Sequence, residues 1–237
     1  MFHRHHGIFG RRPLKVLLER EQIFMSEYKV SKIMKLLHLE AKHGRRKLKN
    51  VYTSPHTSQY RGAHLYPKLS EEEKQQKIWS MDFTEERIQG KKIFTCAIIS
   101  INSKIIVAHK FSFKNTSEFA QETLEEAIKK YGSPYMILTD RGSQFTSKLF
   151  REVLENHQII HSMSRAYTST DNAYIETFWK SLKVETGNID DITLENYKRL
   201  INFYMLYYNH TRPHSGLNYY APLEYAGLKR TMSFDSV

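Results

Sequence analysis

Three acidic residues stand where an isolated charge would be costly. Asp82 interrupts an apolar strand pattern, Asp140 ends an apolar run, and Glu176 lies one turn into an amphipathic segment. Burying an unpaired carboxylate costs free energy, and neighbouring like charges raise each other's pKa. Divalent cations such as Mg²⁺ remove that penalty, because they take carboxylate oxygens as ligands and keep sites for water or phosphate oxygens. Such acids predict metal ions that activate a nucleophilic oxygen and stabilise the leaving oxygen of a phosphodiester.

Each acid also has an ordinary structural interpretation. Asp82 can be an edge-strand residue, Asp140 a turn or helix-capping residue, and Glu176 a solvated helix residue. Taken singly, these interpretations are the more common ones. The metal hypothesis therefore depends on a fold that brings the three carboxylates together.

The segments that carry the acids predict an α/β domain, because three strand-like runs are followed by helices that alternate with two further strands. The expected strands are 77–85, 91–101, 104–113, 135–140 and 159–163. The expected helices are 117–132, 147–157, 173–185 and 193–209. We expect Ser117 to cap the first helix and Gly132 to end it, and Asp171 and Asn172 to cap the third. Adjacent strand ends and that third helix can bring the acids to one edge of a mixed five-stranded sheet.

Charge divides the chain into two parts. The 237 residues carry a formal net charge of +11. Residues 1–77 hold 17 Lys and Arg against 7 Asp and Glu, whereas residues 78–237 hold 19 against 18. A basic segment joined to a nearly neutral body favours a polyanionic partner, most often nucleic acid. The alternative is a solubilising basic face.

Two amphipathic segments near the N-terminus, 11–22 and 27–39, are joined by a short polar turn and predict a helix-turn-helix-like pair. A basic tract follows, and we expect its residues Arg45, Arg46 and Lys47 to contact DNA. The predicted organisation is a DNA-binding segment, a linker, a catalytic core with C-terminal helices, and a tail. Their boundaries are 1–50, 51–76, 77–225 and 226–237.

The sequence gives no sign of a membrane protein or a secreted protein. It has no run of about 18 apolar residues, and residues 1–12 lack the apolar stretch of a secretory signal. Cys96 is the single cysteine, which excludes an intramolecular disulfide and fits a reducing cytoplasm. The histidine-rich stretch 3–6 lacks convincing metal-ligand spacing, and we interpret it as a frayed or DNA-facing terminus.

The sequence motifs around the three acids match a known pattern. WSMDFT contains Asp82, TDRGSQFTS contains Asp140, and TDNAYIETFWKSLKVE contains Glu176, with 35 residues between the last two acids. YNHTRPHSGLNYYAPLEY fills 208–225. The chain therefore resembles the transposases and retroviral integrases that share a D, D, 35, E triad. It is most similar to the product of the second reading frame (OrfB) of the IS-three family of bacterial insertion sequences, whose basic N-terminal segment its helix pair also resembles.

This resemblance implies an RNase H-like fold and a transposase that cleaves and joins strands of double-stranded DNA at terminal inverted repeats. It implies that Asp82, Asp140 and Glu176 hold two Mg²⁺ ions, for which Mn²⁺ can substitute. Water or a DNA 3′-hydroxyl would be the nucleophile. We expect a homo-oligomer on DNA, a partner or fusion from an upstream frame (OrfA), no membrane, and a cytoplasmic, nucleoid-associated location. An RNase H-type nuclease and a catalytically silent DNA-binding relic are the alternatives.

Several residues near the acids are candidate DNA contacts. Lys180 and Lys183 follow Glu176 at i+4 and i+7 and share its helix face. A lysine at the second position is usual in the family and implies contact with phosphate near the cleaved bond. Lys180 can alternatively form an ion pair with Glu176. Arg141 and Gln144, in the loop after the second acid, are expected to lie beside the DNA backbone.

The C-terminal motif leaves alternatives open. Arg212 is expected to bind DNA phosphate, or to buttress the acidic edge, or with Pro213 to end a helix. The aromatic residues before it predict helix packing rather than a platform for base stacking. They are Phe203, Tyr204, Tyr207 and Tyr208.

Overall fold

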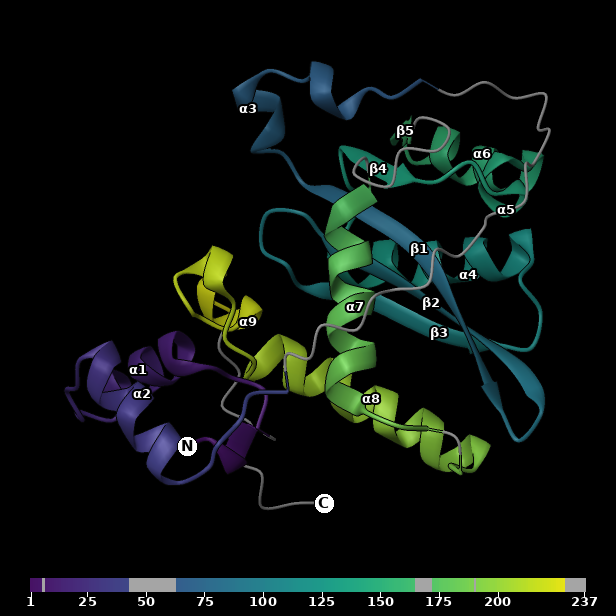
Figure 1. Cartoon of the computed structure of the whole chain (residues 1–237). Coiled ribbons are helices and arrows are strands. Elements are labelled where there is room, and N and C mark those ends of the chain that lie inside the picture. Colours follow the sequence, from purple (N-terminus) through teal and green to yellow (C-terminus); the bar gives the residue numbers. More distant parts are fainter. Residues whose placement is uncertain (6, 43–62, 165–171, 190, 229–237) are drawn as a thin grey trace. The chain divides into compact units, whose positions relative to one another are not determined.

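The computed structural model describes residues 1–5, 7–42, 63–164, 172–189 and 191–228 (Figure 1). The chain divides into two compact units. The helical unit comprises Met1–Val51, Ser181–Gly187 and Phe203–Val237, and the sheet unit comprises Tyr52–Lys180 and Asn188–Asn202. The residues after 202 therefore group with the N-terminal segment. Within the described parts of the chain, no helix is both long and apolar enough to cross a membrane.

The sheet unit is built on a mixed sheet of five strands. They are β1 (Ile78–Ile88), β2 (Lys91–Ser100), β3 (Ile106–Ser112), β4 (Met136–Thr139) and β5 (Ile160–Met163). Their order is β3-β2-β1-β4-β5. β1 pairs antiparallel with β2 and parallel with β4, so the sheet changes direction at β1 (Figure 1). The predicted mixed sheet is confirmed.

The helices of the sheet unit cover both faces of the sheet. They are α3 (Glu71–Lys74), α4 (Ser117–Tyr131), α5 (Ser143–Thr146), α6 (Lys148–Asn156) and the first parts of α7 (Ala173–Thr186) and α8 (Leu194–His210), with the short η2 (Tyr66–Lys68) before them. Side chains of β1 alternate between the faces. Phe83 packs against Phe119 of α4 at 5.5 Å between ring centroids, whereas its neighbour Asp82 bonds to Trp179 of α7. α4 and α7 therefore lie on opposite faces (Figure 1).

The ends of α4 correct one prediction and confirm another. Thr116, not Ser117, is the N-cap, and its hydroxyl accepts a hydrogen bond from the Phe119 amide at 3.3 Å. Thr116 has the extended backbone that lets a cap side chain reach back to the first turn, whereas Ser117 is already helical. Gly132 ends the helix with φ of 74°, a conformation that favours glycine.

The helical unit contains the predicted helix pair as α1 (Arg11–Arg20) and α2 (Glu27–Leu36), together with η1 (His3–His5), η4 (Ser215–Leu217), α9 (Pro222–Tyr225) and the last parts of α7 and α8. His5 is 4% exposed, and its ring packs between Phe9 and Tyr207. The prediction of a frayed terminus is therefore wrong for His5, because its ring fills the apolar interior of this unit.

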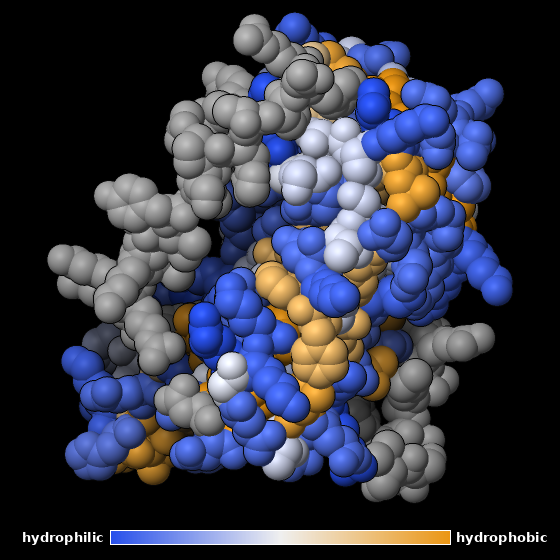
Figure 2. Space-filling view, turned by 90° about the vertical axis from the view of Figure 1, so that its right-hand side faces the viewer, coloured by the Kyte–Doolittle hydropathy of each residue, from blue (hydrophilic) through white to orange (hydrophobic). Residues whose placement is uncertain are grey.

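The aromatic residues of α8 confirm the packing interpretation. Tyr204, Tyr207 and Tyr208 are buried, and only Phe203 of the four is exposed. Tyrosine rings that fill a core cannot serve as a base-stacking platform. The face of the molecule drawn in Figure 2 is mostly hydrophilic, with apolar residues in small separate areas.

Candidate active site

Two neighbouring strands place Asp82 and Asp140 side by side. Asp82 lies within β1, and Asp140 follows β4 directly. The parallel register pairs Ser80 with Leu138, so two further residues along each strand lead to the two acids. Because paired strands lie about 4.8 Å apart, the fold holds these carboxylates close together.

The electrostatics of Asp82 reflect two neighbouring acids. Burial, the charge of Asp140 and, to a smaller extent, the charge of Glu176 raise the pKa of Asp82 to about 8. Hydrogen bonds from the Phe83 amide and from Trp179 act in the opposite direction without cancelling this rise. Partial desolvation also raises the pKa of Glu176. Without a cation, this edge of the sheet therefore favours protonated carboxyls.

Glu176 approaches the pair from the first turn of α7. The start of that helix is tied to β1, because Asn172 is buried and its Oδ1 accepts a hydrogen bond from the Ser80 hydroxyl. Of the two predicted capping residues, Asp171 lies outside the described residues. Among the residues that the structure describes, no three His, Cys, Asp or Glu side chains are already close enough to form a metal cluster. The geometry is a close carboxylate pair with an exposed third acid near it.

The loop after Asp140 is organised by that carboxylate. Its Oδ1 accepts a hydrogen bond from the Gly142 amide at 2.8 Å, so Asp140 also has the turn role that the alternative interpretation gave it. A methyl group at position 142 would collide with the side-chain amide of Gln144, which folds back over the glycine. Arg141 donates from Nε to the Ser164 carbonyl at 2.8 Å and so fastens the loop to the chain beyond β5.

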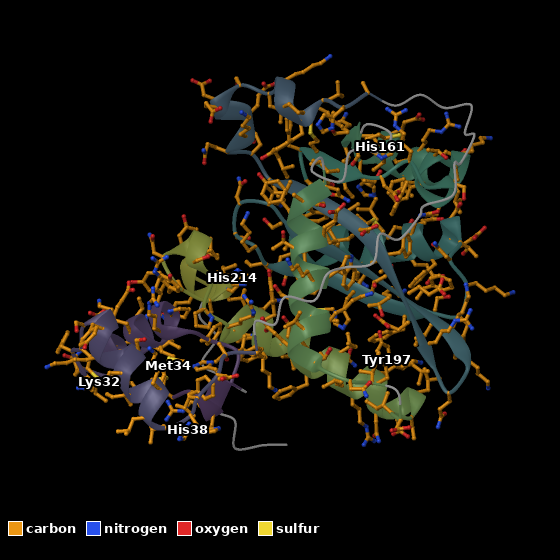
Figure 3. All side chains as sticks on the ribbon, viewed as in Figure 1. Lys32, Met34, His38, His161, Tyr197 and His214 are labelled. Atoms are coloured by element: carbon orange, nitrogen blue, oxygen red, sulfur yellow. The ribbon has the colours of Figure 1, made fainter. Side chains whose placement is uncertain are left out.

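A polar network behind Asp140 was not predicted. The Thr139 hydroxyl donates to the Asp140 carbonyl at 2.8 Å and lies 2.9 Å from His161 Nε2. Since the hydroxyl proton is used, Nε2 must carry the proton of a neutral imidazole. Burial lowers the pKa of His161 to about 4, in agreement with this state. Figure 3 shows His161, which lies on β5 next to β4. No local motif identifies this pair, because it depends on the alignment of two parallel strands.

Trp179 was also missed. Its indole Nε1 donates to Asp82 Oδ2 at 3.2 Å, and its side chain is 6% exposed. The available signal was its spacing, because Trp179 follows Glu176 by three residues and so lies on the same side of the helix.

Comparison with known proteins identifies the family. Residues 72–169 and residues 157–222 match two family profiles, each described as an integrase core domain. The chain is 29% identical over 229 residues to the transposase for insertion sequence element IS904 of Lactococcus lactis, covering 95% of this chain and 90% of the relative. It is 25% identical over 234 residues to the putative transposase InsK for IS150 of Escherichia coli, covering 95% and 80%. The chain belongs to the integrase-core family of insertion-sequence transposases.

Solved structures support the fold of this transposase. The HTLV-2 integrase catalytic core, solved in complex with magnesium, superposes with a TM-score of 0.51 at 19% identity, over 63% of this chain and 95% of that one. A chain of the simian T-cell lymphotropic virus intasome in complex with a PP2A regulatory subunit gives 0.56 at 16% identity, over 94% and 74%. At these identities the likeness concerns the fold, and it confirms the predicted RNase H-like, integrase-core architecture.

The lysines of α7 in the transposase differ in their surroundings. Lys180 is exposed, and within the described residues no ion pair joins it to Glu176, so the structural alternative for Lys180 is not observed. Lys183 is half-buried and belongs to the part of α7 that groups with the helical unit. Three residues of the predicted basic tract, Arg45, Arg46 and Lys47, lie outside the described residues.

Arg212 of the transposase lies in a buried ion pair. Its Nη2 and Nε bond to the carboxylate of Glu185 at 2.6 and 2.9 Å, and the pair is almost completely removed from solvent. The Tyr204 hydroxyl donates to the same carboxylate at 3.0 Å. A guanidinium enclosed in this way does not face an external phosphate, and the geometry therefore favours the structural role of Arg212 over DNA contact.

Proposed function

We propose that this chain carries out transposition by divalent-metal-dependent cleavage and transfer of DNA strands at the terminal inverted repeats of its insertion sequence. The observation that carries the proposal is the carboxylate pair of Asp82 and Asp140 at adjacent strands, with Glu176 close enough to raise the pKa of Asp82. Membership of the integrase-core transposases supports a polynucleotidyl transferase over the alternatives of a nuclease or a silent relic.

Two Mg²⁺ ions, for which Mn²⁺ can substitute, fit this set of donors. Carboxylate oxygens are the ligands that these hard cations prefer, and positive charge would offset the repulsion that now favours protonation of Asp82. When bound, such ions would activate a water or a 3′-hydroxyl and stabilise the leaving oxygen. Glu176 is exposed on α7 and would complete the ligand set by turning its side chain toward the pair.

The chain's own residues would position the DNA around these acids. Asp140 is held by the Gly142 amide, and the Gln144 side chain covers that glycine, so a phosphate that approaches this loop would meet or displace the Gln144 amide. Arg141 and Gln144 flank that glycine. Lys180 and Lys183 share a helix face with Glu176 and would contact phosphates near the cleaved bond.

The N-terminal segment offers a second DNA contact, on α2. We define the α2 lysine face as the outward side of this helix, which carries Lys29, Lys32 and Lys35. All three side chains are exposed, and among the described residues none has an ion-pair partner. The one buried residue of the helix, Val30, lies on the opposite side. Figure 3 shows Lys32 on this helix.

Within the described residues, the basic residues of the neighbouring helix α1, unlike the lysines of α2, form ion pairs. Its basic residues are paired with acids: Arg11 and Arg12 with Glu27, Lys15 with Glu19, and Arg20 with Glu224. Unpaired lysines on one helix face give a concentrated positive charge that releases counterions when it meets phosphate. Tyr28 and Leu36 are exposed on the same face, at 75% and 77%, and supply apolar contacts of the kind made to base edges. We therefore assign DNA contact in this segment to α2.

The proposed reaction also requires several copies of the chain on the DNA. Strand transfer joins two element ends to a target, and one catalytic site per chain implies more than one copy on the DNA. We propose a homo-oligomer on DNA, with a partner or fusion from the upstream frame (OrfA) supplying further contacts to the element ends.

The proposal is tested with a labelled duplex that ends in the element's inverted repeat. Purified protein with Mg²⁺ or Mn²⁺ should release a nicked end and then join it to a second duplex. Asp140→Asn keeps the shape of the side chain and removes one negative charge, so it should bind the duplex and form neither product. Equal product from the wild type and Asp140→Asn would remove the catalytic assignment. Cleavage without joined product would identify a nuclease.

A further inference from the structure

The indole of Trp179 is the side-chain donor from α7 to the carboxylate of Asp82. The bond runs from Nε1 to Oδ2 over 3.2 Å, and the ring is buried, in contact with Phe178 at 4.9 Å between centroids. A ring held by packing cannot rotate freely to follow the carboxylate. The indole therefore sets the orientation of the Asp82 side chain.

The chemistry of the indole suits this role. An indole N–H is a donor only, so it cannot replace the carboxylate as a metal ligand. It occupies one lone pair of Oδ2, and together with the Phe83 amide it leaves further carboxylate lone pairs for a cation. Donors to a carboxylate also favour its ionised form, which is the form that binds metal. Trp179 thus acts against the burial that otherwise favours the neutral acid at this position.

The bond also connects two ligand-bearing elements. Trp179 follows Glu176 by three residues on α7, and Asp82 lies in β1. A hydrogen bond between the indole and Asp82 therefore fixes the first turns of α7 against the strand that carries the first acid. Groups that hold a metal ligand by a hydrogen bond affect both the orientation and the basicity of that ligand.

We propose that Trp179 is the positioning residue that holds the Asp82 carboxylate for a divalent cation, and that cation binding therefore changes the fluorescence of this one indole. The inference rests on the proposed function, because it takes Asp82 as a metal ligand. The sequence contains two tryptophans. The other, Trp79, is buried in β1 and points to the face opposite Asp82. It therefore serves as a matched control.

The test is a Mg²⁺ titration of the full chain, followed by tryptophan emission and by calorimetry. The wild type and Trp79→Phe should show a saturable change in emission that Trp179→Phe lacks. Trp179→Phe keeps an aromatic ring in the core and loses the donor, so it should bind Mg²⁺ about 10-fold more weakly. Asp82→Asn in the Trp79→Phe background should abolish the emission change. If Trp79→Phe fails to fold, the difference between the wild type and Trp179→Phe gives the same signal.

Unchanged Mg²⁺ affinity in folded Trp179→Phe would overturn the positioning role, as would an emission change that persists in Asp82→Asn. If the wild type still cleaves and joins DNA in Mg²⁺ under either result, the proposed function stands and only the role of Trp179 falls. If the wild type binds no divalent cation in calorimetry and forms no product, both are overturned.

Discussion

Replacing Asp82 with asparagine should stabilise the metal-free protein at alkaline pH. In the folded state the pKa of Asp82 is about 8, against an ordinary value of 3.8, with burial as the largest cause and the charge of Asp140 as the next. Between these two values the folded state binds a proton that the unfolded state has released. The free energy of unfolding therefore falls as pH rises through this window, and the loss is complete above pH 8. Asparagine has no carboxylate to ionise, so the variant escapes this loss.

The magnitude follows from the shift. A difference of roughly four pKa units at about 1.4 kcal/mol each sets an upper limit of about 6 kcal/mol. The side chain is partly open to solvent, and repulsion from Asp140 can relax by movement of the loop, so we expect a gain of about 1–3 kcal/mol at pH 8.5. At pH 4 the gain should vanish, because the wild-type carboxyl is then neutral in the folded state.

Urea unfolding with a chelator, followed by circular dichroism from pH 4 to pH 9, measures this difference directly. Saturating Mg²⁺ should reverse the order at pH 8.5, because the cation stabilises the ionised wild-type site and has lost a ligand in the variant. The reasoning is refuted if Asp82→Asn is no more stable than the wild type at pH 8.5 in chelator, or if its advantage does not grow with pH.

The remaining predictions concern other parts of the chain. Removing either partner of the buried pair of Glu185 and Arg212 should lower the free energy of unfolding by about 3–5 kcal/mol, because a buried charge is left unpaired. The double variant with leucine at 185 and methionine at 212 should lower the free energy of unfolding, measured in the same urea assay, by less than either single change. Alanine at the three positions of the α2 lysine face should weaken duplex binding and reduce the slope of log affinity against log salt by about 2–3, whereas Lys15→Ala, which breaks a pair within α1, should leave the slope unchanged. The depressed pKa of His161 keeps it neutral in the fold, so stability should fall as pH drops from the ordinary value of 6.5 to about 4. His161→Gln should remove that part of the acid sensitivity, and identical pH profiles of unfolding would contradict the assignment.

The sequence determined the order and type of the elements, because these depend on spacing within short stretches. Strand-like runs and helical periodicity located all five strands of the sheet and its longer helices α4, α6, α7 and α8, but not the four-residue helices α3, α5 and α9. The same local spacing placed Asp140 after a buried strand and Glu176 one turn into a helix. Pairing α1 with α2 was likewise visible from two amphipathic segments separated by a short turn.

Only the tertiary structure decided which side chains meet. Trp179 bonds to a residue 97 positions away, and Thr139 meets His161 through the register of β4 and β5. Arg212 illustrates the difference most clearly, since in the sequence it is one basic residue in a motif, equally suited to phosphate or to a helix end. Its partner Glu185 lies 27 residues earlier. Burial of the pair decides between phosphate binding and a structural role for Arg212. A guanidinium enclosed with a carboxylate is committed to the core, and no local pattern encodes that enclosure.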